Sequence, residues 1–235
     1  MKRFTIGDIH GNFKALKQCL EKSNFNYKED KLIVLGDICD GFSCTYQVVE
    51  ELLKIDNLIF IIGNHDEWFM NHMRSGWSHD IWLHQGGINT IKSYTKGELG
   101  YNIPVTHQAF FNEGKYYHIE DNMIFIHGGF ITDERLIDQK PSTFTWDRSI
   151  IEYAKKQPIP FNDVVKEEIS EDILWNKVFI GHSDTRYINK KIIPLKYNNL
   201  WCLDTGCGWL GGKLTIMDID TEEYWQSDEV GPHER

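Results

Sequence analysis

The chain has 235 residues, of which 41% are hydrophobic and 26% charged, as is typical of one globular domain that folds without disulfides. Its 35 acidic and 25 basic residues give a net charge of −10, which disfavours binding to a nucleic-acid polymer and favours divalent cations. The apolar runs are too short to cross a membrane. Five cysteines without CxxC spacing and a start with no room for a signal peptide lead us to expect a single cytoplasmic domain over residues 1–235.

Strands and helices alternate in the first third of the chain. Apolar runs at residues 4–6, 31–35 and 58–62 each lead into a glycine and are predicted to be strands. Helical spacing predicts one helix after Asn12, which is placed to cap it, and a second helix starting near Ser43. Three strand–loop–helix units indicate a parallel sheet covered by helices, whose ligands bind at the carboxyl ends of the strands.

The remaining two thirds are less regular. Residues 67–114 are rich in aromatic side chains and helical in pattern, and are predicted to be an inserted helical cap. A hairpin is expected over 116–126, with Asp121-Asn122 as its turn, and a further strand over 178–180. Three more strands are expected in a second, more antiparallel sheet, at 200–203, 213–219 and 223–225. The predicted fold class is therefore α/β: a two-sheet β-sandwich flanked by helices, with an inserted cap.

Five strand ends carry a glycine beside a side chain that can bind a metal. They supply Asp8 and His10, Asp37, Asn64 and His65, His127, and His182. Carboxylate, amide and imidazole groups suit Mn, Fe or Zn, whereas the cysteine ligands of structural zinc sites are missing from these motifs. Asp37 lies on the central strand of the three and can bridge two ions, which together could activate water and neutralise charge in phosphoryl transfer.

The motifs in order resemble those of the calcineurin-like metallophosphoesterases. They read Gly7-Asp8-Ile9-His10-Gly11, Gly36-Asp37-Ile38-Cys39-Asp40-Gly41, Gly63-Asn64-His65-Asp66, His127-Gly128-Gly129 and Gly181-His182. The resemblance runs from residue 4 to about residue 219. Within this family, the chain more specifically resembles the bacterial and phage phosphoprotein phosphatases and the related symmetrical diadenosine tetraphosphatases. Residues 82–87 resemble the cap segment of these enzymes, and residues 146–148 resemble the segment whose arginine binds phosphate.

The resemblance implies a role for each matching residue. It places a first metal on Asp8, His10 and Asp37, and a second on Asp37, Asn64, His127 and His182. It makes His65 the proton donor to the leaving group, Asp40 its orienting carboxylate and Arg148 the ligand of phosphate oxygens. The expected cofactors are two divalent ions, with manganese first and Fe, Zn or Ni as alternatives.

Two departures from the phosphatase branch affect the expected substrate. Gly41 stands where that branch has an arginine after the residue matched by Asp40, and Asp66 stands where it has glutamate. The predicted function is hydrolysis of phosphomonoesters, with phosphoserine or phosphothreonine in proteins, or a small phosphoester, as substrate. The alternatives are a phosphohydrolase for diadenosine tetraphosphate-like dinucleotides or other phosphodiesters, and a non-catalytic protein-binding scaffold. If Gly41 has an ordinary backbone conformation, Gly41→Arg is expected to favour phosphomonoesters.

Overall fold

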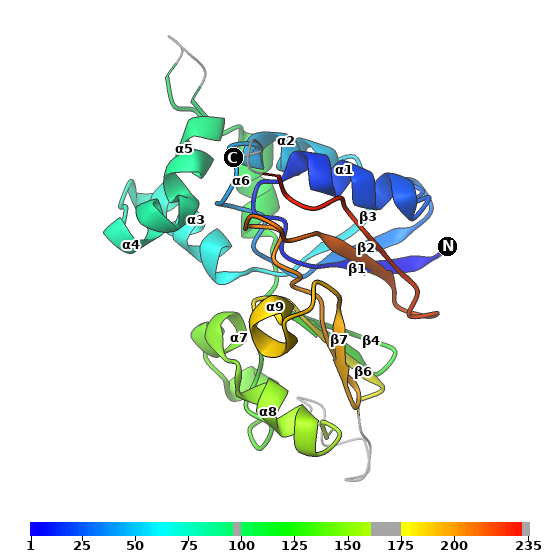
Figure 1. The fold of residues 1–235 in the computed structure, drawn as a ribbon. Helices are drawn as coiled ribbons and strands as arrows, with labels where there is room; N and C mark the ends of the chain where they lie inside the picture. Colours follow the sequence, from blue (N-terminus) through cyan, green and yellow to red (C-terminus); the bar gives the residue numbers. More distant parts are fainter. Residues whose placement is uncertain (96–99, 161–174, 232–235) are drawn as a thin grey trace.

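The computed structural model describes residues 1–95, 100–160 and 175–231. Residues 96–99 of the predicted cap lie outside the described residues. The described part holds two five-stranded sheets stacked face to face, with helices on both outer sides (Figure 1). The predicted fold class, two sheets flanked by helices, is therefore confirmed.

The first sheet has the strand order β10-β9-β1-β2-β3. Its strands are β1 (Arg3–Ile6), β2 (Lys31–Val34), β3 (Asn57–Phe60), β9 (Thr215–Asp218) and β10 (Tyr224–Gln226). The strands β1, β2 and β3 are parallel, as predicted, whereas β9 runs antiparallel to β1 and β10 antiparallel to β9.

The second sheet has the order β4-β5-β6-β8-β7. Its strands are β4 (Tyr117–Glu120), β5 (Met123–Ile126), β6 (Lys177–Ile180), β7 (Leu195–Tyr197) and β8 (Leu200–Cys202). The predicted hairpin is β4–β5, and both sheets mix parallel with antiparallel pairs. The assignment of 213–219 and 223–225 to the second sheet is wrong, because those residues extend the first sheet beyond β1. The sequence did not predict β7.

Each central strand is buried on both faces, which explains its unbroken apolar sequence. In β2, Leu32 and Val34 pack toward helices, whereas Ile33 contributes to the core between the sheets. That inner core also contains Phe125 and Phe179, which are paired in register and stack with ring centroids 5.0 Å apart. Along such a strand, alternate residues therefore pack between the two sheets, and the residues between them pack against the outer helices.

Helices cover the outer faces and one side of the sandwich. The first sheet is covered by α1 (Phe13–Lys22), which Asn12 caps as predicted, and α2 (Thr45–Leu52). The second sheet packs against α7 (Pro141–Trp146) and α8 (Ser149–Lys156). Two shorter helices, η3 (Leu136–Asp138) and α9 (Thr185–Asn189), lie elsewhere in the described chain. None of the helices in the described ranges is long and apolar enough to span a membrane.

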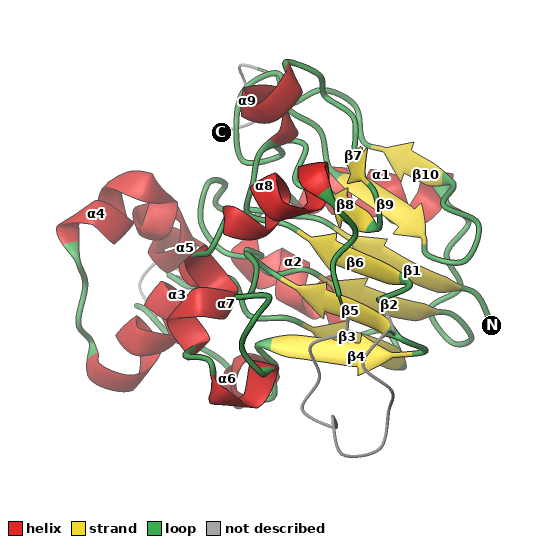
Figure 2. Cartoon of the chain, turned by 90° about the horizontal axis from the view of Figure 1, so that it is seen from below, coloured by secondary structure: helices red, strands yellow, loops and turns green. Residues whose placement is uncertain are grey.

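A block of short helices lies beside the sheets in the region where the sequence predicts a cap (Figure 2). It consists of α3 (Asn64–Ser75), α4 (Asp80–Trp82), the π-helical turn η1 (Leu83–Gly87), α5 (Ile88–Ser93) and α6 (Val105–Asn112). Aromatic contacts hold it together, with Phe69 packed on Tyr94 and on Phe111. Because α3 begins at Asn64, this block continues directly from one of the metal-type motifs.

Candidate metal centre

Three of the predicted metal residues follow strands with a left-handed backbone. His10 follows β1 with a φ of 50°, Asp37 follows β2 with a φ of 48°, and His182 follows β6 with a φ of 58°. Such a conformation costs a non-glycine residue on the order of 1–3 kcal/mol and is concentrated at functional sites. The sharp turns bring these side chains together at one edge of the two sheets.

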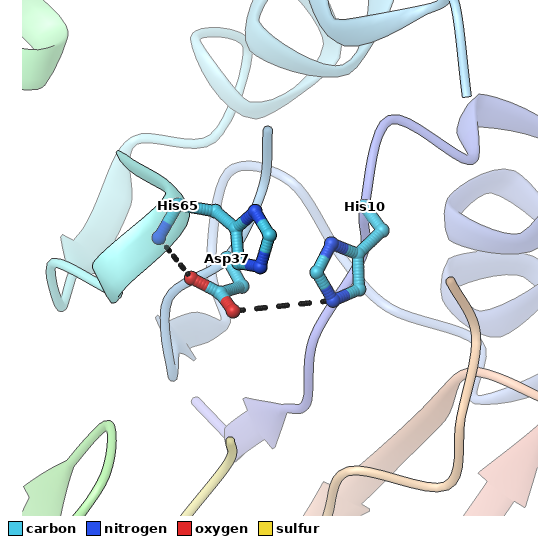
Figure 3. A group of neighbouring side chains, drawn as sticks. All are labelled: His10, Asp37 and His65. Atoms are coloured by element: carbon cyan, nitrogen blue, oxygen red, sulfur yellow. Dashed lines mark hydrogen bonds and ion pairs between the residues drawn. The ribbon is translucent and has the colours of Figure 1, made fainter. Parts of the chain in front are cut away.

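Asp37 is at the centre of the group. Its Oδ2 lies 3.9 Å from His10 Nε2, and its Oδ1 accepts a hydrogen bond from the His65 backbone N–H at 3.0 Å (Figure 3). The same Oδ2 lies 3.4 Å from His127 Nε2. Burial opposes ionisation here, but the imidazoles of His127 and His65 hold the pKa of Asp37 well below its usual range. Asp37 is therefore an ionised carboxylate with donor atoms on either side of it.

Two sets of potential metal ligands share Asp37. One consists of His10, Asp37 and His65, and the other of Asp37, His127 and His182, with the donor atoms of each set within 4.8 Å of one another. This shared carboxylate has the position expected of a bridging ligand. His65 occurs in the first set where the resemblance implies Asp8.

The other two predicted ligands lie against the second set. Asp8 accepts the His182 backbone N–H at 3.0 and 3.1 Å, and it also lines the cavity described below. Asn64 places its Oδ1 3.1 Å from His127 Nε2. The structure thus brings all six predicted metal residues into one cluster.

The chemistry of this cluster fits divalent cations. His182 Nε2 is buried and has no hydrogen-bond partner among the described residues, as expected of a nitrogen reserved for a metal. Burial lowers the pKa of His10 to about 4 and that of His182 to about 2, so both rings are neutral, which is the ligand form. Burial and the nearby Asp204 raise the pKa of Asp8 well above its usual range. A cation would offset this crowding of carboxyl groups.

Backbone carbonyls orient two of the imidazoles. His10 Nδ1 lies 3.1 Å from the Cys39 carbonyl oxygen, and His127 Nδ1 lies 2.7 Å from that of Leu35. A ring that donates Nδ1–H to a carbonyl keeps the lone pair of Nε2 for a metal. In both residues Nε2 is the atom that faces Asp37.

Asp66 lies beneath the cluster, and the sequence analysis assigned it no role. Its fully buried carboxylate accepts backbone N–H groups from Asp37 at 2.7 Å, Ile38 at 3.0 Å, Cys39 at 3.2 Å and Gly63 at 2.9 Å. Burial and Asp37 raise the pKa of Asp66 to about 7, but four donors that each need an acceptor favour the ionised form. Asp66 therefore joins the loops that follow β2 and β3. The signal in the sequence that could have indicated this role is the place of Asp66 within the third motif, two residues after Asn64.

His65 and Asp40 form a close pair, as the resemblance implies. His65 Nδ1 is 2.6 Å from Asp40 Oδ2, and Asp40 is fully buried. Burial opposes the charged imidazole, but the carboxylates of Asp37 and Asp40 outweigh it and raise the pKa of His65 to about 9. Trp82 and Thr90 also donate hydrogen bonds to Asp40, contacts that the sequence analysis did not identify.

Arg148 is exposed at the start of α8, on the wall of the cavity. It lines the same cavity as His182, and its charge contributes to the lowered pKa of His182. Glu67 anchors the preceding helix, because it accepts hydrogen bonds from Thr145 and Tyr116, both at 3.0 Å. Arg148 therefore follows an anchored segment and lies on the cavity wall.

A cavity of about 830 Å³ opens over the cluster. Its floor includes Asp8, His10, Asp37, Asn64, His65 and His182. Asp40 and His127 are fully buried and do not line it. Asp204 lines it as well.

Gly41 does not have the ordinary backbone conformation that the Gly41→Arg expectation requires. Its φ is +71°, and an added Cβ would lie 2.9 Å from the carbonyl oxygen of His10. The cap covers it from the other side, since a Cβ on Gly86 would lie 2.2 Å from the Gly41 nitrogen. An arginine here would distort the loop rather than reach a phosphate, so this substitution cannot test substrate preference.

Comparison with known proteins identifies the family of the chain. A profile of the calcineurin-like phosphoesterase family matches residues 1–224. The symmetrical bis(5'-nucleosyl)-tetraphosphatase of Neisseria meningitidis is 22% identical over 98% of this chain and 97% of its own length. The protein of the same name from Pseudomonas entomophila is 23% identical over 97% of this chain and 94% of its own.

Solved structures share the fold at lower identity. A protein assigned as a diadenosine tetraphosphatase superposes with a TM-score of 0.68 at 16% identity, covering 97% of this chain and 94% of its own. A protein serine/threonine phosphatase from Saccharomyces cerevisiae has a TM-score of 0.56 at 13% identity, covering 98% and 80%.

Proposed function

The chain belongs to the calcineurin-like phosphoesterase family, and we propose that this metal-dependent hydrolase cleaves dinucleoside polyphosphates of the diadenosine tetraphosphate type. The observation that carries the proposal is the cavity, which extends far beyond the space that one phosphate needs. At about 830 Å³, it is in the upper range for small-molecule sites. The names of the relatives from Neisseria and Pseudomonas support the same substrate class.

The cavity walls suit nucleosides. Leu83, Ile88, Ile151 and Ile188 line it, together with the rings of Trp146, Tyr187 and Trp209. Trp146 packs edge-on against His182, with ring centroids 5.8 Å apart. Trp209 follows Gly208, whose Cα position lies so close to His10 that an added Cβ would be 2.6 Å from the imidazole. Aromatic faces that remain solvent-exposed beside a catalytic site are natural stacking surfaces for nucleobases.

The charges of the site suit inner phosphates. A phosphomonoester carries close to two negative charges near neutral pH, whereas each inner phosphate of a dinucleotide carries one. With Gly41 closed to a side chain, Arg148 is the arginine that lines the described cavity. One arginine matches a singly charged phosphate better than a dianion.

The mechanism assigns a role to each group. Two divalent ions bound by Asp8, His10, Asp37, Asn64, His127 and His182 would supply charge neutralisation and activation of water. Arg148 holds the non-bridging oxygens of the phosphate that water attacks. As the P–O bond to the leaving nucleotide breaks, His65 gives its Nε2 proton to the leaving oxygen. Asp40 accepts Nδ1–H and so fixes which nitrogen faces the substrate.

The Asp40–His65 pair favours a second candidate, which is hydrolysis of phosphoserine or phosphothreonine in proteins. A serine or threonine alkoxide leaves poorly and depends strongly on a proton donor, whereas a nucleoside diphosphate leaves well without one. This phosphomonoester activity is the one that the sequence analysis ranked first, and the same assay tests it.

A steady-state substrate panel distinguishes the candidates. With Mn²⁺ supplied, kcat/KM is measured for an aryl phosphate, a phosphothreonine peptide, diadenosine tetraphosphate and a cyclic nucleotide. We expect the highest value for diadenosine tetraphosphate, with ADP as the only product. A higher value for the phosphopeptide would overturn the proposal in favour of the second candidate. Asp37→Asn, purified in parallel, controls for contaminating phosphatases.

Two tryptophans offer a matched test of nucleobase binding. Trp209 lines the cavity and is 52% exposed, whereas Trp77 is 53% exposed and does not line it. Stacking contributes about 1–3 kcal/mol per base, so Trp209→Ala should raise KM for diadenosine tetraphosphate about 5- to 150-fold. KM for the aryl phosphate should change little, and Trp77→Ala should change neither. An equal rise for both substrates would contradict base stacking at Trp209.

A further inference from the structure

Asp40 is held by two side chains of the helical block as well as by His65. The Trp82 indole donates Nε1–H to Asp40 Oδ2 at 2.9 Å and to Oδ1 at 3.1 Å. Thr90 Oγ1 donates to Asp40 Oδ1 at 2.7 Å and accepts the Asp40 backbone N–H at 2.8 Å. The side chains of Trp82, Thr90 and Asp40 are all buried. Both carboxylate oxygens are thus occupied, Oδ1 by Thr90 and Trp82 and Oδ2 by Trp82 and His65.

The local backbone is shaped to bring the indole to this position. Gly87 lies against the Trp82 ring so closely that an added Cβ would be 2.4 Å from it. Gly86 has a φ of 113° within the π-helical turn and packs on Gly41. The two glycines allow a turn tight enough to place Trp82 and Thr90, eight residues apart, on the same carboxylate.

The same segment also forms a wall of the substrate cavity. Residues 83–86 and 88–89, which lie between Trp82 and Thr90, line the cavity. Asn89 Nδ2 donates to the Gly41 carbonyl oxygen at 2.7 Å, next to Asp40 in the chain. One side of the segment therefore faces substrate while the other holds Asp40.

We propose that Trp82 and Thr90 are positioning residues, which fix the Asp40 carboxylate so that His65 presents its proton to the leaving group. The inference rests on the proposed role of His65. If either donor is lost, the carboxylate can rotate and His65 loses its fixed orientation. The consequence is confined to the proton-transfer step, because neither residue contacts the predicted metal ligands in the described contacts.

The test uses substitutions that remove one donor at little cost in volume. Thr90→Val removes the hydroxyl and Trp82→Phe removes the indole N–H. Rates are measured on an alkyl phosphate, which leaves poorly, and on p-nitrophenyl phosphate, which leaves well. Both variants should lose roughly tenfold on the alkyl phosphate, as part of the about 10²–10⁴-fold contribution of a general acid, and less than about twofold on p-nitrophenyl phosphate.

Matched variants separate positioning from a general loss of structure. Thr90→Ser restores the hydroxyl and should restore the wild-type ratio of the two rates. Thr5→Val removes another fully buried hydroxyl, which donates to the Ile33 carbonyl oxygen in the first sheet, and should leave the ratio unchanged. Metal content and melting temperature are recorded for every variant. Equal losses on both substrates in Thr90→Val and Trp82→Phe would overturn the proposal.

A double-mutant cycle separates this inference from the role of His65. His65→Asn alone should reproduce the dependence on leaving group, and adding Thr90→Val should cause no further loss. If His65→Asn slows both substrates equally, the proposed role of His65 is wrong. If His65→Asn behaves as expected but Thr90→Val and Trp82→Phe retain wild-type rates, the role of His65 stands and the positioning inference is wrong. A fold-loss in the double variant that equals the product of the two single fold-losses would also contradict positioning.

Discussion

Replacing Asp66 with asparagine should destabilise the protein severely, although the change keeps the shape of the side chain. Two backbone donors, Asp37 and Gly63, point at Asp66 Oδ2, and two others, Ile38 and Cys39, point at Oδ1. An asparagine amide has one carbonyl oxygen, so in either orientation its NH₂ faces two N–H groups. Two buried donors would then lose their acceptor.

The magnitude follows from those contacts. Hydrogen bonds to a charged group contribute about 1.5–3 kcal/mol each, so losing two costs about 3–6 kcal/mol. The free energy of unfolding of a typical domain is about 5–15 kcal/mol, so a loss of this size removes much of the stability of the protein. The metal cluster should suffer as well, because these bonds hold Asp37 in its left-handed conformation at a φ of 48°. Bound metal should therefore fall together with stability.

Urea unfolding followed by circular dichroism measures the stability, and elemental analysis measures the bound metal. Asp138→Asn is the matched control, because Asp138 is half-exposed and pairs with Arg135, and an exposed pair contributes at most about 1 kcal/mol. If Asp66→Asn loses no more than this control and keeps its metal, the four hydrogen bonds do not have the role assigned to them.

Three further changes test other parts of the molecule. Chelation should abolish turnover and Mn²⁺ should restore it, whereas full activity of metal-free protein would contradict a metal-dependent mechanism. Arg148→Gln should lower kcat/KM by at least about tenfold, because it removes at least one charge-assisted hydrogen bond to the substrate phosphate. Arg135→Gln, at an exposed position outside the cavity, should leave kcat/KM unchanged. Glu51→Gln should lower the free energy of unfolding at pH 7 by about 1–3 kcal/mol. Burial opposes ionisation of Glu51, but Lys54 and Tyr27 lower its pKa to about 2, so its contribution is complete above pH 4.5 and the difference should disappear as the pH falls toward 2. A difference that persists at low pH would refute this account of Glu51.

The assembly of the candidate site could be predicted because its residues follow strands. Parallel neighbours such as β1, β2 and β3 end at the same edge of a sheet, so residues that directly follow them must come together. His10 and Asp37 meet for this reason, at 3.9 Å. His127 comes from the other sheet, after β5, and its place beside Asp37 depends on how the two sheets stack. For that residue the resemblance to a known family supplied what strand order alone did not.

The sheet assignment of the last strands could not be read from the pattern. In β9, Ile216 packs toward helices and Met217 packs between the sheets. A strand buried on both faces shows no alternation that would say which sheet it joins. Only the pairing with β1, in which Thr5 lies opposite Met217, places it in the first sheet. The predicted strand was real, but its partner was not visible in the sequence.

The roles of Asp66, Trp82 and Thr90 were hidden for a different reason. Each acts through hydrogen bonds to residues 27 to 50 positions away in the sequence, which no local pattern encodes. What such residues share is burial of a polar group, and a buried polar group must have a partner. In a sequence they look like ordinary helix residues, and only the fold shows that they converge on the loop after β2.

Gly41 lies where the loop that carries Asp40 meets the helical block. The phosphatase branch that the sequence resembles places an arginine here, whereas in this chain a side chain at position 41 would meet the carbonyl oxygen and the Cβ of His10. The cap contacts the Gly41 backbone, since Gly86 packs on its nitrogen and Asn89 binds its carbonyl oxygen. The segment that packs on the Gly41 backbone also holds Asp40 through Trp82 and Thr90. The positive φ of Gly41 and its contact with Gly86 thus belong to the same loop that places Asp40, so an arginine at position 41 would have to reshape this loop and should disturb Asp40 as well.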